Sequence, residues 1–125
     1  MIKLIAVLAG GAVGTGFRYL ISTLIYSRVK QPAFPYATFL INVTGSFVIG
    51  LLVELFESRL PVSPTLRVAL LTGVLGGYTT FSSYSLETFS LVRNGEAWLA
   101  ALNALGSVAL GLVAVWLGVR LAQSF

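Results

Sequence analysis

The sequence contains no cysteine and no histidine among its 125 residues. Without cysteine there are no disulfides, thiolate metal sites or cysteine nucleophiles. Without histidine there is no Ser-His-Asp triad and no imidazole metal ligand. Charge is also scarce: 10% of the residues are charged, with eight Lys and Arg against four Asp and Glu. This small, dispersed positive excess fits lipid headgroups better than nucleic acid, so we expect no nucleic-acid partner.

What the chain has instead is apolar surface: 57% of its residues are hydrophobic and its mean hydropathy is +0.93. A soluble domain of this size cannot bury so much apolar area, which indicates an all-α membrane protein. A signal peptide is a second interpretation of the first 17 residues, where Lys3 precedes an apolar run. We disfavour it because the remaining chain is equally apolar.

The apolar residues fall into four stretches, each long enough to cross a hydrocarbon core with about 20 residues. They cover residues 3–27, 36–57, 65–92 and 97–122. The connecting segments carry charge, and the first two also carry prolines, which disfavour helix continuation. The pattern predicts one domain over residues 1–125, built from four transmembrane helices and attached to no soluble domain.

The third stretch contains a segment that disfavours a continuous helix, Gly73–Ser85. Gly76 and Gly77 weaken a helix, and the hydroxyls that follow compete for backbone hydrogen bonds. Irregular backbone at membrane depth survives only inside protein or beside a watery cavity, and broken helices commonly build ion sites there. Carbonyls freed near Gly76 and Thr79 would suit a small hard cation. We therefore expect a break near the middle of the third span and a role in ion handling, and we expect no enzymatic activity because no acid–base pair or nucleophile is well placed.

The positive charges flanking the spans are nearly balanced between the two sides of the membrane. An even number of spans puts Lys3, Arg59, Arg67 and Arg120 on one side. The other side has Arg28, Lys30 and Arg93. Since such charges normally set orientation, the balance predicts insertion both ways round. The alternative is that local context fixes one orientation. Four short helices enclose little space, so a pore would need a second copy, and both orientations together permit an antiparallel homodimer.

Several polar side chains lie within the predicted spans and have two interpretations each. Asn42 and Asn103 either tie helices together or line a polar path, to which Ser82, Ser83 and Ser107 would add hydroxyl donors. Arg18 either reaches the interface or places positive charge in a vestibule that gathers anions. For Glu87 the plainest expectation is an ion pair with an Arg.

Phe81 and Tyr84 lie three residues apart after the predicted break, so they share a helix face. Aromatic residues in membrane helices usually serve packing. The alternative is that their electropositive ring edges replace part of an anion's hydration shell.

Three motifs together resemble the bacterial fluoride-channel family known as Fluc or CrcB, and the resemblance covers essentially the whole chain. They lie at Gly10–Tyr19, at Asn42–Phe47 and, most specifically, at Gly76–Glu87. The resemblance implies a passive channel that exports fluoride across the bacterial inner membrane. It also implies an antiparallel dual-topology homodimer with two fluoride pores and a central structural sodium ion.

The resemblance assigns roles to the residues singled out above. Main-chain carbonyls of Gly76 and Thr79 would hold sodium at the dimer axis. The implied fluoride pore residues are Asn42, Phe81, Ser82, Ser83, Tyr84, Asn103 and Ser107, with Arg18 in the vestibule and Glu87 as a structural or pore-end group. The chain departs from the family where Tyr84 replaces a second Phe, where Asn103 stands in place of a common Tyr, and where Gly111 supplies no hydroxyl.

Two other function classes remain open at this point. A proton-coupled multidrug transporter also has four spans and is often dual in topology, but it typically needs a carboxylate in the first span, and residues 3–27 contain none. A non-conducting structural subunit is the third interpretation. Transport measured on the purified protein separates all three.

Overall fold

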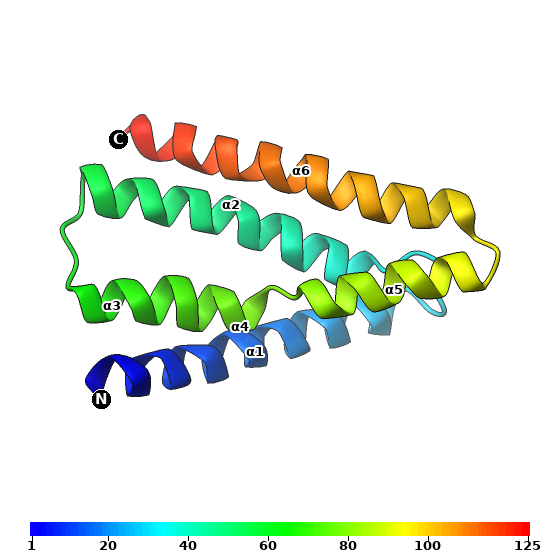
Figure 1. Cartoon of the computed structure of the whole chain (residues 1–125), viewed down its shortest axis with the longest axis horizontal. Coiled ribbons are helices and arrows are strands. Elements are labelled where there is room, and N and C mark those ends of the chain that lie inside the picture. The colour runs from blue at the N-terminus through cyan, green and yellow to red at the C-terminus, as the bar shows by residue number, and fades with distance from the viewer.

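The structure, a computed structural model, describes residues 1–125 and is entirely helical (Figure 1). Its elements are α1 (Ile2–Arg28), α2 (Tyr36–Ser58), α3 (Pro64–Val68), the π-helix η1 (Ala69–Leu75), α4 (Gly76–Tyr78), α5 (Phe81–Arg93) and α6 (Ala97–Gln123). Three helices, α1, α2 and α6, are long and apolar enough to cross a membrane. The fourth predicted span is the interrupted series from α3 to α5. All four predicted ranges are confirmed to within two residues.

The ends of the helices follow local sequence signals. Ser63 caps α3 by accepting a hydrogen bond from the Leu66 amide at 3.2 Å, and Pro64 occupies the first helical position, where its missing amide hydrogen costs nothing. Gly95 adopts a positive φ of 79° in the turn between α5 and α6. Both termini and the α2–α3 loop lie at one end of the bundle, and the other two loops lie at the opposite end (Figure 1). This is the arrangement that an even number of spans requires.

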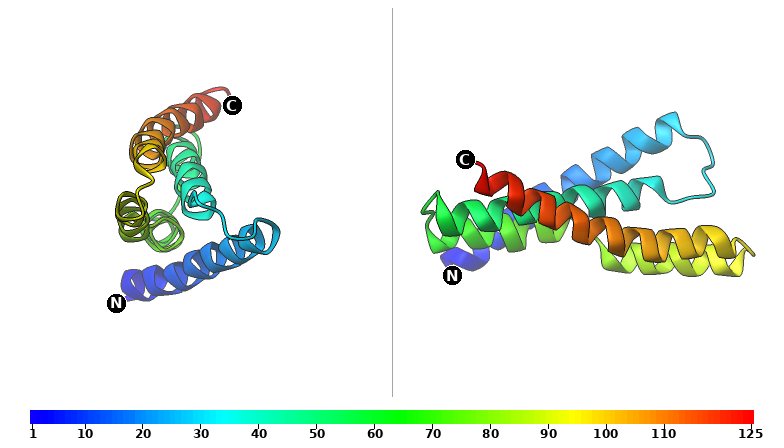
Figure 2. Two further views of the ribbon diagram at one scale, coloured as in Figure 1. Left: turned by 90° about the vertical axis from the view of Figure 1, so that its right-hand side faces the viewer. Right: turned by 90° about the horizontal axis from the view of Figure 1, so that it is seen from above.

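The helices pack in two main pairs. α2 packs along α6, whereas α1 packs mainly against η1 and α4. Gly14 lets α1 approach the backbone of Val74, and Gly77 of α4 likewise lies close to the backbone of Gly11. These glycines therefore serve close helix packing. Seen from above, the C-terminal half of α1 diverges from α5 (Figure 2).

The π-helical turn was not predicted from the sequence. It precedes the break, and it contains Gly73, which packs against Gly10 of α1. Short π-helical segments within regular helices are frequently found at functional sites. The third span is therefore irregular both within η1 and at the break itself.

The single chain has little interior. Only 17 of its 125 residues are buried, and large apolar side chains cover the outsides of α1 and α6. An apolar exterior of this extent is normal only against lipid or another protein. The polar side chains of the chain are therefore to be sought between the helices, away from this apolar exterior.

Candidate functional site

The third span is broken at Thr79 and Thr80, about midway along it. α4 ends at Tyr78 and α5 begins at Phe81, and the two residues between them have extended backbone, with ψ of 159° and 116°. The predicted break is thus confirmed. Because hydrocarbon cannot satisfy free backbone groups, protein groups must do so here.

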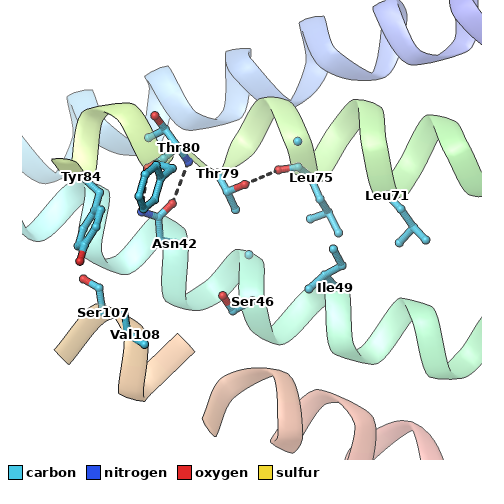
Figure 3. Close-up of a pocket in the computed structure, with 13 residues that line it drawn as sticks. Asn42, Ser46, Ile49, Leu71, Leu75, Thr79, Thr80, Tyr84, Ser107 and Val108 are labelled. Atoms are coloured by element: carbon cyan, nitrogen blue, oxygen red, sulfur yellow. Dashed lines mark hydrogen bonds between the residues drawn. The ribbon is translucent and has the colours of Figure 1, made fainter. Parts of the chain in front are cut away.

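Asn42 of α2 satisfies the backbone of the break with both ends of its amide. Its Oδ1 accepts from the Thr80 amide at 2.9 Å, and its Nδ2 donates to the Thr80 carbonyl at 3.0 Å (Figure 3). Of the two interpretations of Asn42, the structure shows the tie between helices directly. The same side chain also lines a cavity, described below, so the second interpretation stays a prediction.

Thr80 also caps α5 through its side chain. Its Oγ1 accepts from the Ser83 amide at 3.3 Å and donates to the Ser83 hydroxyl at 3.1 Å. The hydroxyl of Ser82 lies 3.5 Å from the same oxygen. An N-cap of this kind satisfies an otherwise free amide at the helix start. The serines that follow the break therefore gather around Thr80.

The carbonyls of Gly76 and Thr79 fit the expected cation site in their chemistry. Carbonyl oxygen is a ligand that hard cations accept, and the C-terminal end of α4 carries the negative end of its helix dipole. The Thr79 carbonyl accepts no hydrogen bond in this chain, and the Gly76 carbonyl has lost its helical donor, the Thr80 amide, to Asn42. The neighbouring Gly77 carbonyl accepts a long hydrogen bond from Thr15, at 3.4 Å. Their binding of sodium stays a prediction.

A cavity of about 390 Å³ lies beside the break, between α2, the broken span and α6 (Figure 3). Asn42, Ser46 and Ser107 are among its polar lining residues, together with Thr79 and Thr80 of the break, and Phe81 and Tyr84 supply its aromatic side chains. Ser46 lies within the Asn42–Phe47 motif but was not among the residues expected in the pore. Its hydroxyl lies 3.4 Å from where a side chain at Gly111 would begin, so α2 supplies a hydroxyl where α6 has none.

The two aromatic rings of this cavity lie against each other. The ring centroids of Phe81 and Tyr84 are 5.5 Å apart with an interplanar angle of 39°. Phe81 is 78% exposed on the single chain, which is unusual for a large apolar ring that lines a cavity. The Tyr84 hydroxyl donates to the Ala104 carbonyl of α6 at 3.0 Å. The hydroxyl therefore has a protein partner, and the ring faces the cavity.

Asn103 does not line this cavity, although the resemblance assigns it to the pore. Its side chain is only 1% exposed, and its Nδ2 donates to the Thr88 hydroxyl of α5 at 2.8 Å. Its Oδ1 accepts from Ser107, which does line the cavity, at 3.4 Å. Of its two interpretations, the structure therefore shows the tie between helices. Thr88 was missed, although its position four residues after Tyr84 was a usable signal.

A second, more polar cavity of about 310 Å³ opens where α1 diverges from α5. Arg18 and Tyr26 of α1, Thr38 of α2, and Ser83 and Glu87 of α5 are among its lining residues. Arg18 thus faces a polar space beside the break. Its effect on anions stays a prediction.

Glu87 has a different partner from the expected one. It pairs with no Arg; the one ion pair of the chain joins Arg67 to Glu57 at 2.8 Å. Instead the Thr38 hydroxyl donates to Glu87 Oε1 at 2.8 Å, while Oε2 is buried without a hydrogen-bond partner. The expectation of an arginine partner was wrong: Arg18 and Glu87 line the same cavity, but they form no ion pair.

Thr80 lines both cavities and bonds to Asn42, so it stands at the centre of the polar groups. The fold brings together Asn42, Thr79, Phe81, Tyr84 and Ser107 around one cavity. It places Arg18, Ser83 and Glu87 around the other and keeps Asn103 inside the α5–α6 contact.

Comparison with known proteins agrees with this arrangement. The family described as "CrcB-like protein, Camphor Resistance (CrcB)" matches residues 5–119. A protein of Solibacter usitatus, named fluoride-specific ion channel FluC, is 48% identical over 121 residues, covering 97% of this chain and 98% of its own length. A protein of the same name from Agrobacterium fabrum is 46% identical over 125 residues, covering 99% of this chain and 98% of its own length. A third protein of this name, from Ruminiclostridium cellulolyticum, is 46% identical over 124 residues, covering 99% of this chain and 95% of its own length.

These relatives match the chain from end to end, and its apolar helices make it a multi-pass membrane protein. Since the family match also spans every helix that contributes to the two cavities, this chain belongs to the CrcB family.

Proposed function

We propose that this protein is a fluoride-selective channel that lets fluoride leave the cell passively across the cytoplasmic membrane and so lowers cytoplasmic fluoride. The names of its close relatives support this function. The structural observation that carries it is the cavity beside a break at membrane depth, where amide, hydroxyl and aromatic groups meet. It is a channel function, with no chemical step to catalyse.

The groups around this cavity suit a small anion that must lose water. The Asn42 amide uses one hydrogen for the Thr80 carbonyl and keeps a second one. The edges of Phe81 and Tyr84 present positive ring hydrogens. α5 also begins at this cavity, and the first amides of a helix favour negative charge. A narrow route with these donors would favour fluoride over the larger chloride.

A second, inverted copy completes the site in this proposal. Phe81 is exposed on the single chain and the Thr79 carbonyl has no donor, yet both residues border the cavity. Lipid can satisfy neither a free carbonyl nor an ion path. The near balance of flanking charge supports insertion in both orientations, and an antiparallel homodimer would then carry two pores related by a two-fold axis in the membrane plane.

The proposal also includes a sodium ion at that axis. The carbonyls of Gly76 and Thr79 from each copy would provide four oxygen ligands, a set that suits a hard cation. When bound, the ion supplies positive charge that holds two negative helix ends together. Its role is structural.

Ion efflux from liposomes tests the function. Purified protein is reconstituted with internal fluoride or chloride, and release is followed with ion-selective electrodes against protein-free liposomes. We expect fast fluoride efflux and little chloride efflux, with no requirement for a proton gradient. Equal rates for the two ions would contradict selectivity, dependence on a proton gradient would favour a coupled transporter, and no flux would favour a structural subunit.

A further inference from the structure

Two backbone hydrogen bonds of a continuous helix are replaced by side-chain bonds at the break. In an α-helix each amide donates to the carbonyl four residues earlier. The Thr80 amide would then bond to the Gly76 carbonyl, but it donates to Asn42 Oδ1 at 2.9 Å. The Ser83 amide would bond to the Thr79 carbonyl, but it donates to Thr80 Oγ1 at 3.3 Å.

The two carbonyls that lose their donors in this way are those of Gly76 and Thr79. No side-chain donor reaches either of them, and no backbone donor reaches the Thr79 carbonyl. Both residues line the same cavity, and Gly76 has open space beside its α-carbon. Each carbonyl has thus lost its helical donor to a named side chain.

We propose that Asn42 and Thr80 are positioning residues that hold these two carbonyls free for a monovalent cation before the cation arrives. The inference rests on the proposed function, which places a sodium ion at the carbonyls of Gly76 and Thr79. It adds that two other residues, Asn42 and Thr80, keep these carbonyls accessible to the ion. The side chains, rather than the ion, keep the helix open.

The physical reason is preorganisation. An uncapped break would regain hydrogen bonds by winding α4 and α5 into one helix, and a cation would then have to reopen it. Because Asn42 and Thr80 satisfy the amides of Thr80 and Ser83, these two donors keep partners in the open form. Binding then needs little reorganisation, which raises affinity.

Asn42 also connects the two expected ions. Its side chain lines the cavity proposed for the anion, and the same side chain holds the amide that would otherwise block the Gly76 carbonyl. Removing this side chain would therefore change both sites.

The first test is a sodium titration of thermal stability. The unfolding midpoint is measured for the purified protein in detergent, with sodium replaced by N-methyl-D-glucamine at constant ionic strength. A ligand that binds only the folded protein raises the midpoint with its concentration. Thr80→Val removes the capping oxygen at nearly constant shape, Thr80→Ser keeps it, and Ser90→Ala removes a hydroxyl that bonds only to the Leu86 carbonyl of its own helix.

We expect Thr80→Val to need about tenfold more sodium for half of the stabilisation, corresponding to about 1.4 kcal/mol of binding free energy. Thr80→Ser and Ser90→Ala should match the native chain. An unchanged sodium response in Thr80→Val would overturn the inference, and so would a native chain that sodium does not stabilise. Fluoride efflux from the native chain reports on the proposed function independently of these results.

A second measurement needs no variant. Carbonyl carbon-13 chemical shifts of Gly76 and Thr79 are compared by NMR in the native protein with sodium and with N-methyl-D-glucamine. We expect the Thr80 and Ser83 amides to remain protected from hydrogen exchange and both carbonyls to keep non-helical shifts without sodium. Helical carbonyl shifts in the absence of sodium would show that the ion opens the break and would overturn the inference.

Discussion

The Tyr84 hydroxyl of α5 donates to the Ala104 carbonyl of α6 at 3.0 Å. The partner is a backbone oxygen within α6, so it stays in place whatever side chain stands at position 104. The bond holds the ring that lies beside Phe81 at the cavity. The hydroxyl that distinguishes this chain from the family pattern therefore acts between helices.

Tyr84→Phe should consequently have a small effect on conduction. The substitution keeps the ring and removes one interhelical hydrogen bond, which costs about 0.6 kcal/mol of stability on average in membrane proteins. We expect the fluoride efflux rate to stay within about threefold of the native rate, a change of about 0.7 kcal/mol in barrier height. Electrode recordings of efflux measure this, and a fall of about tenfold or more would show that the hydroxyl serves the ion.

Phe81→Ile should reduce fluoride efflux strongly. Phe81 lines the cavity and is 78% exposed on the single chain, so the ring contributes little to packing within that chain. Isoleucine has no positive ring edge, so we expect the fluoride efflux rate to fall by about tenfold or more. A fall of this size corresponds to an increase of at least about 1.4 kcal/mol in the barrier to conduction. Thermal midpoint and elution volume should be unchanged.

Phe89→Ile is the matched control for this prediction. Phe89 lies on the same helix and is also exposed, but it lines neither cavity. Its efflux should equal that of the native chain. An undiminished rate in Phe81→Ile would remove the Phe81 ring from the conduction path.

The spans and the break could be predicted because they depend on local signals. Apolar length set the four ranges, and charge with Pro or Gly set the turns between them. The glycine and hydroxyl run of Gly73–Ser85 placed the break correctly. These features act over a few neighbouring residues, so they need no knowledge of how the helices pack.

The partners of the polar residues could not be predicted, since they depend on how helices are turned toward one another. The sequence left open whether Asn103 lines a polar path with Ser107, and the rotation of α6 buries Asn103 against Thr88. Glu87 bonds to Thr38 of α2, although Arg18 of α1 lines the same cavity as Glu87. The π-helical turn η1 likewise had no sequence signal that was recognised.

The bond between Asn103 and Thr88 should contribute to stability. We expect Asn103→Leu and Thr88→Val each to destabilise the protein, with a coupling energy of about 0.6 kcal/mol between them, as is typical of interhelical hydrogen bonds. A double-mutant cycle of unfolding free energies in detergent or bicelles measures this coupling. Additive effects of the two substitutions would contradict the bond seen at 2.8 Å.

The contact between α1 and the broken span should tolerate no side chain at Gly14. A methyl group there would overlap the carbonyl oxygen of Val74, a backbone atom that cannot turn aside. Overpacking of this kind costs about 1–3 kcal/mol, so Gly14→Ala should lower the thermal midpoint and the yield of monodisperse protein.

Gly16→Ala is the control, because its methyl group would meet nothing within 4 Å and the helix propensity of alanine is higher than that of glycine. Equal stability of the two variants would mean that α1 does not pack against the backbone of η1 as described. Since α1 also carries Arg18 to the second cavity, a destabilised Gly14→Ala protein should lose efflux together with its fold, whereas Gly16→Ala should retain both.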